Sequence, residues 1–149
     1  MPYLQFDVAA QLTVATKRQV ALAAITQYAE IMQTAPAMVN VGFRELGAEN
    51  LWHLVDGELV PGLIVMCDIR RGRPPEQRAR LAEALRALAA AEVGIAPEHV
   101  VIEFTQHTAD EMHRVTGWGR EWTDAEAQAS EGAASDADDR SRPRPTTSS

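Results

Sequence analysis

The chain contains an internal repeat: shifting the sequence by 61 positions lays residues 3–45 over residues 64–106 without a gap. Identical residues in the two copies include Asp7 and Asp68, Ala21 and Ala82, Ala23 and Ala84, Ala35 and Ala96, Pro36 and Pro97, Val39 and Val100, and Phe43 and Phe104. Self-similarity at a fixed spacing indicates that one supersecondary unit has been duplicated. The fold must therefore be built from two similar halves.

The first copy has the pattern of a strand, a helix and a second strand. Residues 3–8 alternate and carry aromatic and β-branched side chains, which predicts a strand. Residues 13–16 supply threonine N-cap candidates, and residues 17–32 have the apolar spacing of a helix. Pro36 closes the helical region, and residues 38–43 alternate again as a strand.

The second copy predicts the same order of elements. Residues 63–69 form a nearly continuous apolar run, as expected of a buried strand. Pro74 and Pro75 open a helix in the first turn, where proline is tolerated, and Gly94 ends it. Residues 100–104 form the last main strand.

A strand, a long helix and a strand normally make a right-handed crossover with parallel strands. Two such units predict an α/β (α+β) fold, in which a four-stranded sheet carries two helices on one face. Between the units, residues 51–55 and 58–60 flank Asp56-Gly57, a pair with strong hairpin tendency. After them, Thr108 and Glu111 are spaced as a capping box for a short helix.

The domain predicted from these patterns covers residues 1–122, with pseudo-repeats 3–45 and 64–106. Thr123 and Glu126 repeat the capping-box spacing, so a further short helix is expected there. Beyond it, the tail up to residue 149 is rich in Ser, Asp, Ala, Arg and Pro and has no apolar residue larger than alanine. We expect the tail to be disordered.

Composition narrows the class of protein. A single cysteine among 149 residues excludes an internal disulfide framework and a thiolate zinc cluster, so a cytoplasmic location is expected. No apolar run approaches the ~18 residues of a membrane span, which predicts that the protein has no membrane partner. The net charge of -7 argues against nucleic acid as a partner, because phosphate binding rests on lysine and arginine.

Basic residues nevertheless cluster within eleven positions, at Arg70, Arg71, Arg73, Arg78 and Arg80. Arginine's planar fork suits bidentate binding of a carboxylate or phosphate. The first three follow the strand predicted at 63–69, at the carboxyl end where βαβ units place ligands. Gly72 permits a tight turn, so Arg70 and Arg73 can point into the same space. This predicts a site for a small anion; the alternative is a solvated helix N-terminus, where the dipole disfavours positive charge.

Pro2 is a candidate because removal of the initiator methionine would leave it as a free secondary amine. The pKa of such an amine starts above the value of about 8 of ordinary α-amino groups, so burial or nearby cations are needed to keep it neutral near pH 7. If the first strands of the two copies are adjacent and antiparallel, Pro2 lies near the arginines. The alternative is that proline is merely a common second residue.

The remaining polar and reactive residues are less informative. Glu103 alternates with Ile102 and Phe104, which suits a pocket wall, a sheet edge or an interface salt bridge. Cys67 is expected to be a small core residue. The four histidines show no metal-ligand spacing, so neither a metal nor a cofactor is expected. The three tryptophans could cover a pocket, lie in a subunit contact or pack within the domain. They are Trp52, Trp118 and Trp122.

Together, the Met-Pro start, the two fused βαβ units and the run of residues 69–73, Ile-Arg-Arg-Gly-Arg, resemble the tautomerase superfamily. Within it, they are similar to the cis-3-chloroacrylic acid dehalogenase group, over about residues 1–122. The resemblance implies the tautomerase β-α-β fold, a homotrimer and Pro2 as the catalytic residue. It also implies that Arg70 and Arg73 bind the carboxylate of the substrate.

The chain departs from the dehalogenase group at three positions. Ala29 stands where that group has a histidine, and Glu103 and Arg114 stand where it has a tyrosine and a glutamate that activate water. Hydrolytic dehalogenation by that mechanism would require Glu103 or Glu111 to take over as the water-activating carboxylate.

These observations predict a tautomerase-like isomerase that acts on a small enol or keto carboxylic acid. Pro2 would be the general base, Arg70 and Arg73 would hold the carboxylate, and Arg71 and Glu103 are further candidates for substrate contacts. One alternative is hydration, dehalogenation or decarboxylation of a short unsaturated or oxo acid. Another is a non-catalytic binding module, because the order β-α-β-β-α-β also describes ferredoxin-like modules.

Overall fold

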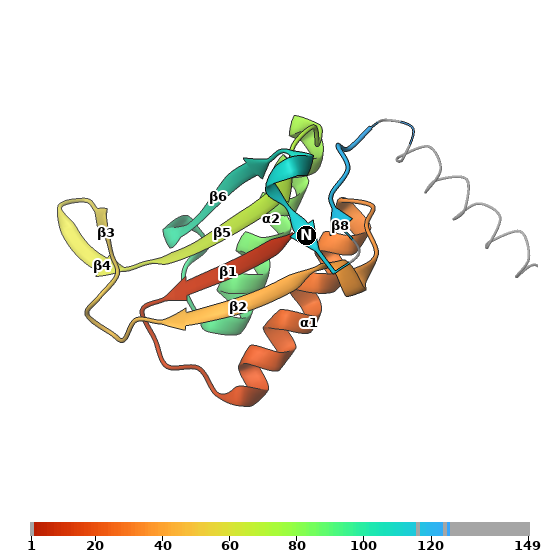
Figure 1. The fold of residues 1–149 in the computed structure, drawn as a ribbon. Helices are drawn as coiled ribbons and strands as arrows, with labels where there is room; N and C mark the ends of the chain where they lie inside the picture. The colour runs from red at the N-terminus through yellow and green to blue at the C-terminus, as the bar shows by residue number, and fades with distance from the viewer. Residues whose placement is uncertain (1, 116, 124, 126–149) are drawn as a thin grey trace, which may run out of the picture.

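A computed structural model describes residues 2–115, 117–123 and 125 of the chain. A four-stranded sheet forms one layer, and two long helices cover one of its faces (Figure 1). The helix predicted after Thr123 and the tail predicted to follow it lie outside the described residues, apart from single positions.

The strands are β1 (Tyr3–Val8), β2 (Asn40–Glu45), β3 (Trp52–Val55), β4 (Glu58–Pro61), β5 (Leu63–Arg70), β6 (Val100–His107), β7 (His113–Arg114) and β8 (Gly117–Trp118). The long helices are α1 (Val14–Ile31) and α2 (Pro75–Val93). Short 3-10 turns occupy Pro36–Met38, Pro97–His99 and Ala109–Glu111. The predicted order of elements is therefore confirmed in both copies of the repeat.

The strand order of the main sheet is β2-β1-β5-β6. β1 is parallel to β2 and β5 is parallel to β6, as expected of crossover units, whereas β1 and β5 are antiparallel. Tyr3 lies opposite Asp68, so the start of β1 is beside the end of β5. The first strands are thus adjacent and antiparallel, which is the condition on which the expected meeting of Pro2 with the arginines depended.

The core lies between the sheet and the helices. Every second residue of β1 and β5 points toward the helices, because successive side chains of a strand face opposite sides. These strand residues are buried: Leu4, Phe6, Val8, Leu63, Val65, Cys67 and Ile69. They pack against a stripe from the helices at spacings of three and four: Val20, Ala24, Tyr28 and Met32, with Leu81, Leu85, Leu88 and Ala89.

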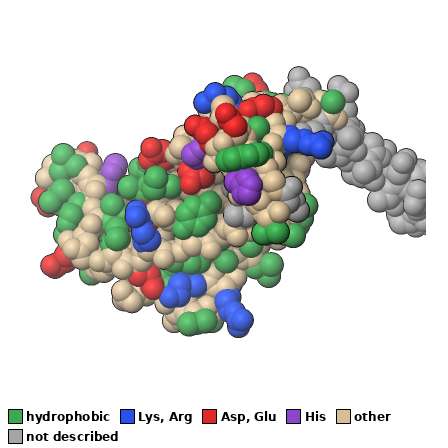
Figure 2. Space-filling model, in the orientation of Figure 1, with side chains coloured by type: hydrophobic (Ala, Val, Ile, Leu, Met, Phe, Trp, Pro, Cys, Tyr) green, Lys and Arg blue, Asp and Glu red, His purple; other side chains and the backbone are tan. Residues whose placement is uncertain are grey.

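The other face of the sheet is not covered by either long helix and is turned toward the viewer in Figure 2. Ile64 and Met66 of β5 are partly buried there, and Val101 of β6 is exposed. Asp7 and Arg44 form an ion pair across β1 and β2 on this face. The open face is thus a mixture of apolar and charged side chains.

The helix ends follow the predicted signals, with one difference between the copies. Thr13 caps α1 by accepting a hydrogen bond from the Thr16 amide at 3.0 Å. α2 ends at Gly94 in the left-handed conformation, with φ of 75°. The corresponding residue after α1 is Gln33, which adopts φ of 47° although it has a side chain. A non-glycine residue in this region carries backbone strain.

Two strand boundaries differ from the sequence predictions. The strand predicted at 38–43 begins only at Asn40, because proline at 36 starts a 3-10 turn that takes up Met38. The strand predicted at 100–104 continues to His107, because β5 beside it also runs further and pairs Arg70 with His107. The hairpin at Asp56-Gly57 joins β3 and β4, with φ of 49° and 86° at its two central residues.

Neither long helix combines the length and the hydropathy that crossing a bilayer requires, within the described part of the chain.

Candidate active site

A pocket of ≈ 420 Å³ opens at the end of the sheet where β1 begins and β5 ends. Nine of the described residues line it, from both copies of the repeat and from the segment after β6: Pro2, Tyr28, Gln33, Thr34, Ala35, Met38, Arg70, Arg73 and Arg114. Three of them are the residues on which the sequence prediction centred, Pro2, Arg70 and Arg73. The structure therefore brings the predicted amine and the two predicted anion-binding groups to one cavity.

Pro2 reaches this pocket because it directly precedes β1. Its carbonyl accepts a hydrogen bond from the Asn40 amide at 3.0 Å, which extends the pairing of β1 with β2 by one residue. Pro2 is buried. Arg70 and Arg73 line the same pocket, so Pro2 lies in a buried place beside guanidinium groups.

Arg70 and Arg73 are positioned by the tight turn between β5 and α2. Gly72 has φ of 98°, a conformation that residues with a Cβ rarely adopt, and this turn allows both arginines to line the same pocket. Arg70 donates a hydrogen bond from Nη1 to the Arg120 carbonyl at 2.9 Å. The buried guanidinium of Arg73 lies 5.3 Å from the centre of the Trp122 ring. The segment at 120–122 therefore packs over the arginine turn and holds it in place.

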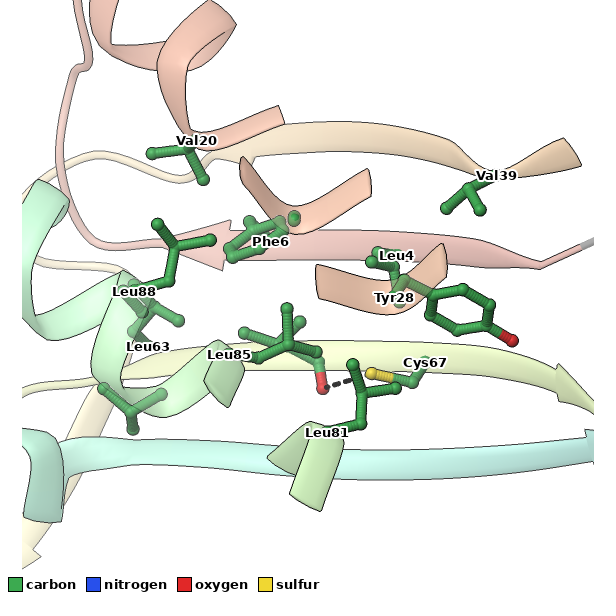
Figure 3. Close-up of a cluster of buried hydrophobic side chains, with 14 of the residues drawn as sticks. Leu4, Phe6, Val20, Tyr28, Val39, Leu63, Cys67, Leu81, Leu85 and Leu88 are labelled. Carbon is green, nitrogen blue, oxygen red and sulfur yellow. Dashed lines mark hydrogen bonds between the residues drawn. The ribbon is translucent and has the colours of Figure 1, made fainter. Parts of the chain in front are cut away.

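Tyr28 is a pocket residue that the sequence analysis did not single out as a functional candidate. It belongs to the apolar stripe of α1 and is 1% exposed. Its ring packs in the core, and its hydroxyl points along the strands toward the beginning of β1 (Figure 3). Burial raises the pKa of Tyr28, against the opposing effect of the nearby Arg73. The hydroxyl is therefore protonated at neutral pH and can donate a hydrogen bond into the pocket.

Arg114 is the third arginine of the pocket, and it comes from the short strand β7. Its Nη1 lies 3.7 Å from the sulfur of Met38, and its Nε is buried without a hydrogen-bond partner. In the sequence, Arg114 stands out only as a departure from the dehalogenase pattern, because a two-residue strand has no recognisable periodicity.

Gln33, Thr34, Ala35 and Met38 supply the wall between α1 and β2. Gln33 accepts a hydrogen bond from Gln77 Nε2 at 3.3 Å, which ties the end of α1 to α2. None of the nine described lining residues is an aspartate or a glutamate. The described part of the pocket wall therefore carries three arginines and no carboxylate.

The other predicted site residues lie elsewhere. Arg71 is exposed and does not line the pocket; its backbone amide donates to the His107 carbonyl at 2.8 Å. Glu103 is exposed on the open face of the sheet, opposite Met66. Glu111 accepts the Thr108 amide at 2.8 Å as the predicted capping box requires, and this bond lowers the pKa of Glu111. The structure does not bring these three side chains into the Pro2 pocket.

A second, smaller pocket of ≈ 240 Å³ lies on the open face, where acidic and histidine side chains gather (Figure 2). His107 is 3.6 Å from Asp68 and 4.0 Å from Glu111. Among the described residues, no group of three His, Cys, Asp or Glu side chains could hold a metal ion. Cys67 is buried in the core, and burial raises its pKa to about 12, so its thiol is unreactive at neutral pH.

Several solved structures are similar in fold to this chain. A member of the cis-3-chloroacrylic acid dehalogenase family, N1, is similar over 90% of this chain and 99% of its own, with TM-score 0.72 and 22% identity. The wild-type symmetric trimer of a fused 4-OT is similar over 78% of this chain and 94% of its own, with TM-score 0.69 and 22% identity. Pt0534 inactivated by 2-oxo-3-pentynoate is also similar over 78% of this chain and 94% of its own, with TM-score 0.69 and 24% identity.

The chain has the tautomerase fold. The fold class expected from the repeat and from the resemblance is therefore confirmed. No family model matches the chain, and no curated protein matches it in sequence. At identities below 25%, the tautomerase fold gives the arrangement of the backbone, and the function has to be argued from the pocket.

Proposed function

We propose that the protein is a tautomerase-like enzyme that moves a proton on a small enol or keto carboxylic acid. The observation that carries the proposal is the meeting of a buried Pro2 with Arg70 and Arg73 in one cavity. Once the initiator methionine is removed, Pro2 is a secondary amine, and the cations around it favour its neutral form. A neutral amine next to an anion-binding group is the smallest set of groups that can move a proton on a bound enol or keto acid.

The proposed reaction assigns one role to each group. Arg70 and Arg73 bind the carboxylate of the substrate with charge-assisted hydrogen bonds. The Pro2 nitrogen accepts the enol proton, or, in the reverse direction, a proton from the carbon next to the carbonyl. The negative charge then lies on the enolate oxygen, where the Tyr28 hydroxyl donates a hydrogen bond. Pro2 returns the proton to the other atom, so substrate and product are isomers and no further reactant is consumed.

The same pocket disfavours hydration and hydrolytic dehalogenation. Both reactions need a base that activates water in addition to the group that handles the substrate. Within the described residues the pocket wall has no carboxylate, and Glu103 and Glu111 are not among its lining residues. We therefore place proton transfer ahead of hydratase, dehalogenase and decarboxylase activity for this chain.

We also propose that the protein assembles as a homotrimer, with the open face of the sheet buried between chains. Exposed and half-buried apolar side chains on that face, including Val101 and Met66, support an interface there. The fused 4-OT similar in fold is a symmetric trimer. Light scattering after size exclusion should give three times the chain mass, and a monomer would contradict the proposal.

The test of the enzyme proposal compares the native protein with Pro2→Ala on phenylenolpyruvate, an enol acid. Intact mass first establishes that the methionine has been removed. A positioned general base contributes ~10²- to 10⁴-fold, so the variant should lose at least about a hundredfold in kcat/KM. Arg80→Met, which removes an exposed arginine of α2 outside the pocket, is the matched control and should retain activity.

A chemical probe tests the amine without relying on turnover. In 2-oxo-3-pentynoate the triple bond is conjugated to a ketone, so a neutral amine can add to its far carbon while the near carbon takes up a proton. Labelling of the native protein should give one adduct, located on the Pro2 peptide by mass spectrometry. An unlabelled Pro2, together with no activity on enol acids, would favour the non-catalytic binding module.

A further inference from the structure

Gln33 is a pocket residue with a strained backbone, and the second copy of the repeat makes the same turn without strain. Gln33 follows α1 and adopts φ of 47°, although it carries a side chain. Its partner in the repeat is Gly94, which ends α2 in the left-handed conformation and has no Cβ. A side chain in left-handed backbone costs free energy of folding, and such strain is typical of binding sites and active sites. The side chain of Gln33 therefore calls for a role that glycine cannot fill.

A hydrogen bond from the other long helix orients the Gln33 amide. Gln77, in the first turn of α2, donates from Nε2 to Gln33 Oε1 at 3.3 Å. This bond engages the oxygen of Gln33, so both N–H groups of its Nε2 are left to donate elsewhere. Because Gln33 lines the pocket, a ligand in the pocket can supply the acceptor.

The pair of glutamines carries a second cost. Oε1 of Gln77 is buried with no hydrogen-bond partner among the described residues. Two apolar side chains at these positions would join the helices without a buried, unpaired acceptor, which costs free energy. The strain at Gln33 and the unpaired oxygen of Gln77 are both unfavourable for folding, so they point to a function of the Gln33 amide at the pocket.

Gln33 and Tyr28 come from the same short stretch of chain. Hydrogen bonds fix the backbone between them, from the Met32 amide to the Tyr28 carbonyl at 2.8 Å and from the Thr34 amide to the Ala29 carbonyl at 3.0 Å. Both side chains line the pocket, and the Tyr28 hydroxyl points toward the beginning of β1 (Figure 3). A hydroxyl and an amide N–H that line one cavity are a donor pair of the kind that stabilises a developing oxyanion.

We infer that Gln33 is a further substrate-binding residue: its Nε2 donates, together with the Tyr28 hydroxyl, to the oxygen that becomes charged in the enolate. Gln77 does not touch the substrate and is the positioning residue that holds the N–H groups of Gln33 toward that oxygen. The inference rests on the proposed function, because the enolate arises from proton transfer at Pro2.

The first test measures kcat and KM on phenylenolpyruvate. Gln33→Met removes the amide but retains an unbranched side chain, and it should lower kcat by about 10- to 100-fold with little change in KM. This loss is smaller than the about 10²- to 10³-fold typical of an oxyanion donor, because Tyr28 still donates to the same oxygen. Gln19→Met, which removes an exposed glutamine of α1 outside the pocket, is the matched control and should retain activity.

A double variant tests the positioning role of Gln77. Gln77→Met alone should lower kcat by less than Gln33→Met does, because the Gln33 amide is still present. Added to Gln33→Met, it should cause no further loss, because the amide that Gln77 holds is then absent. A purely structural contribution of Gln77 would lower kcat equally with and without the Gln33 amide, and such additive losses would overturn the positioning role.

Native kcat in a folded Gln33→Met would overturn the inference. Gln33→Glu is the second variant, which decides if Gln33→Met does not fold. An ionised carboxylate has the shape of the amide but no N–H to donate, so Gln33→Glu should also lose activity. Native kcat in Gln33→Glu would likewise overturn the inference.

Labelling by 2-oxo-3-pentynoate separates this inference from the proposed function. When the Pro2 amine adds to the far carbon of the triple bond, an electron pair moves onto the ketone oxygen before the near carbon takes up a proton. The same donors should therefore speed the addition, and Gln33→Met should slow labelling by about 10-fold or more, whereas Gln19→Met should not. Slower labelling of Gln33→Met with no turnover by the native protein would support the oxyanion site and contradict the enzyme. Turnover that is lost in Pro2→Ala but unchanged in Gln33→Met would do the reverse.

Discussion

At one end of the sheet, β1 begins after Pro2 and β5 ends at Arg70; at the other end, β5 begins at Leu63 and β1 runs into Ala9. The repeat pairs these positions, Pro2 with Leu63 and Arg70 with Ala9, so the two ends share one backbone arrangement. Leu63 is buried and joined to the preceding hairpin, and therefore offers no amine. The two ends are equivalent in backbone but differ in side chains, because Pro2, Arg70 and Arg73 line a pocket at the first of them.

At the end of the sheet where β1 finishes and β5 begins, polar groups bind one another within the protein. Leu12, which pairs with Arg73 in the repeat, donates its amide to the Glu45 carboxylate at 2.6 Å. Glu45 also accepts from the Lys17 ammonium at 2.8 Å, and these two bonds lower the pKa of Glu45. A cation is thus compensated by a carboxylate at that end, whereas the Pro2 end has three arginines and no carboxylate in its described wall. The two ends therefore differ in the charge of their described side chains.

The largest expected effect at the Pro2 end of the sheet is the loss of activity when the Tyr28 hydroxyl is removed. Its partner in the repeat is Ala89, which is buried and has no hydroxyl. Removing a donor to a developing oxyanion typically lowers kcat by about 10²- to 10³-fold. Tyr28→Phe should show such a loss in kcat on an enol acid. KM should change little, because the missing hydroxyl acts on the oxyanion that develops during the reaction. The ring that packs in the core is retained.

The control for Tyr28→Phe is its thermal unfolding, which should stay close to that of the native protein. A variant with native kcat would remove Tyr28 from the mechanism.

The fold was predictable because the pattern of each element depends on residues close in sequence. Alternation in residues 3–8, the prolines at 74 and 75 and the glycine at 94 each fix a local structure. The repeat then predicted two halves with the same order of elements, whereas the adjacent, antiparallel placement of their first strands entered only as a condition. Boundaries were less accurate where tertiary pairing extended a strand, as at His107.

The site was predictable only where position in the chain carries information. Pro2 was found from its place before the first strand, and Arg70 and Arg73 from the strand end and the glycine between them. Tyr28 was missed because the helical spacing that buries it is the same for core and pocket residues. Arg114 reaches the pocket through the chain path after β6, which no local pattern specifies.

The ends of the two helices allow a second comparison. Gly94 adopts φ of 75° with open space where a Cβ would lie, whereas Gln33 adopts φ of 47° and carries a side chain. Left-handed backbone costs a non-glycine residue about 1–2 kcal/mol, so Gly94→Ala should lower the free energy of unfolding by about that amount. Gln33→Gly should raise it by less, because glycine has more entropy to lose on folding and the hydrogen bond from Gln77 is lost.

Urea unfolding of both variants, with enol-acid kinetics of Gln33→Gly, measures whether the strain serves the pocket. We expect the Gln33 variant to gain stability and to lose activity, since Gln33 lines the cavity. A gain in both would mean that the strain at the end of α1 has no role at the site.

The smallest expected effect concerns the two aspartates that the repeat pairs. Asp7 accepts from Arg44 Nε at 2.9 Å, and this bond holds the pKa of Asp7 below its ordinary value; Asp68 instead lies 3.6 Å from His107. A carboxyl whose pKa is lower when folded stabilises the protein above its unfolded pKa of about 3.9, and this contribution disappears as the pH falls through the folded pKa. Asp7→Asn should therefore lower the free energy of unfolding in urea at neutral pH, by about 1 kcal/mol or less for a pair with an exposed arginine. In strong acid the variant should match the native protein. Asp68→Asn should show a smaller difference at neutral pH. Equal losses in the two variants would mean that the two halves of the sheet are held by equivalent ion pairs, against the asymmetry seen in their contacts.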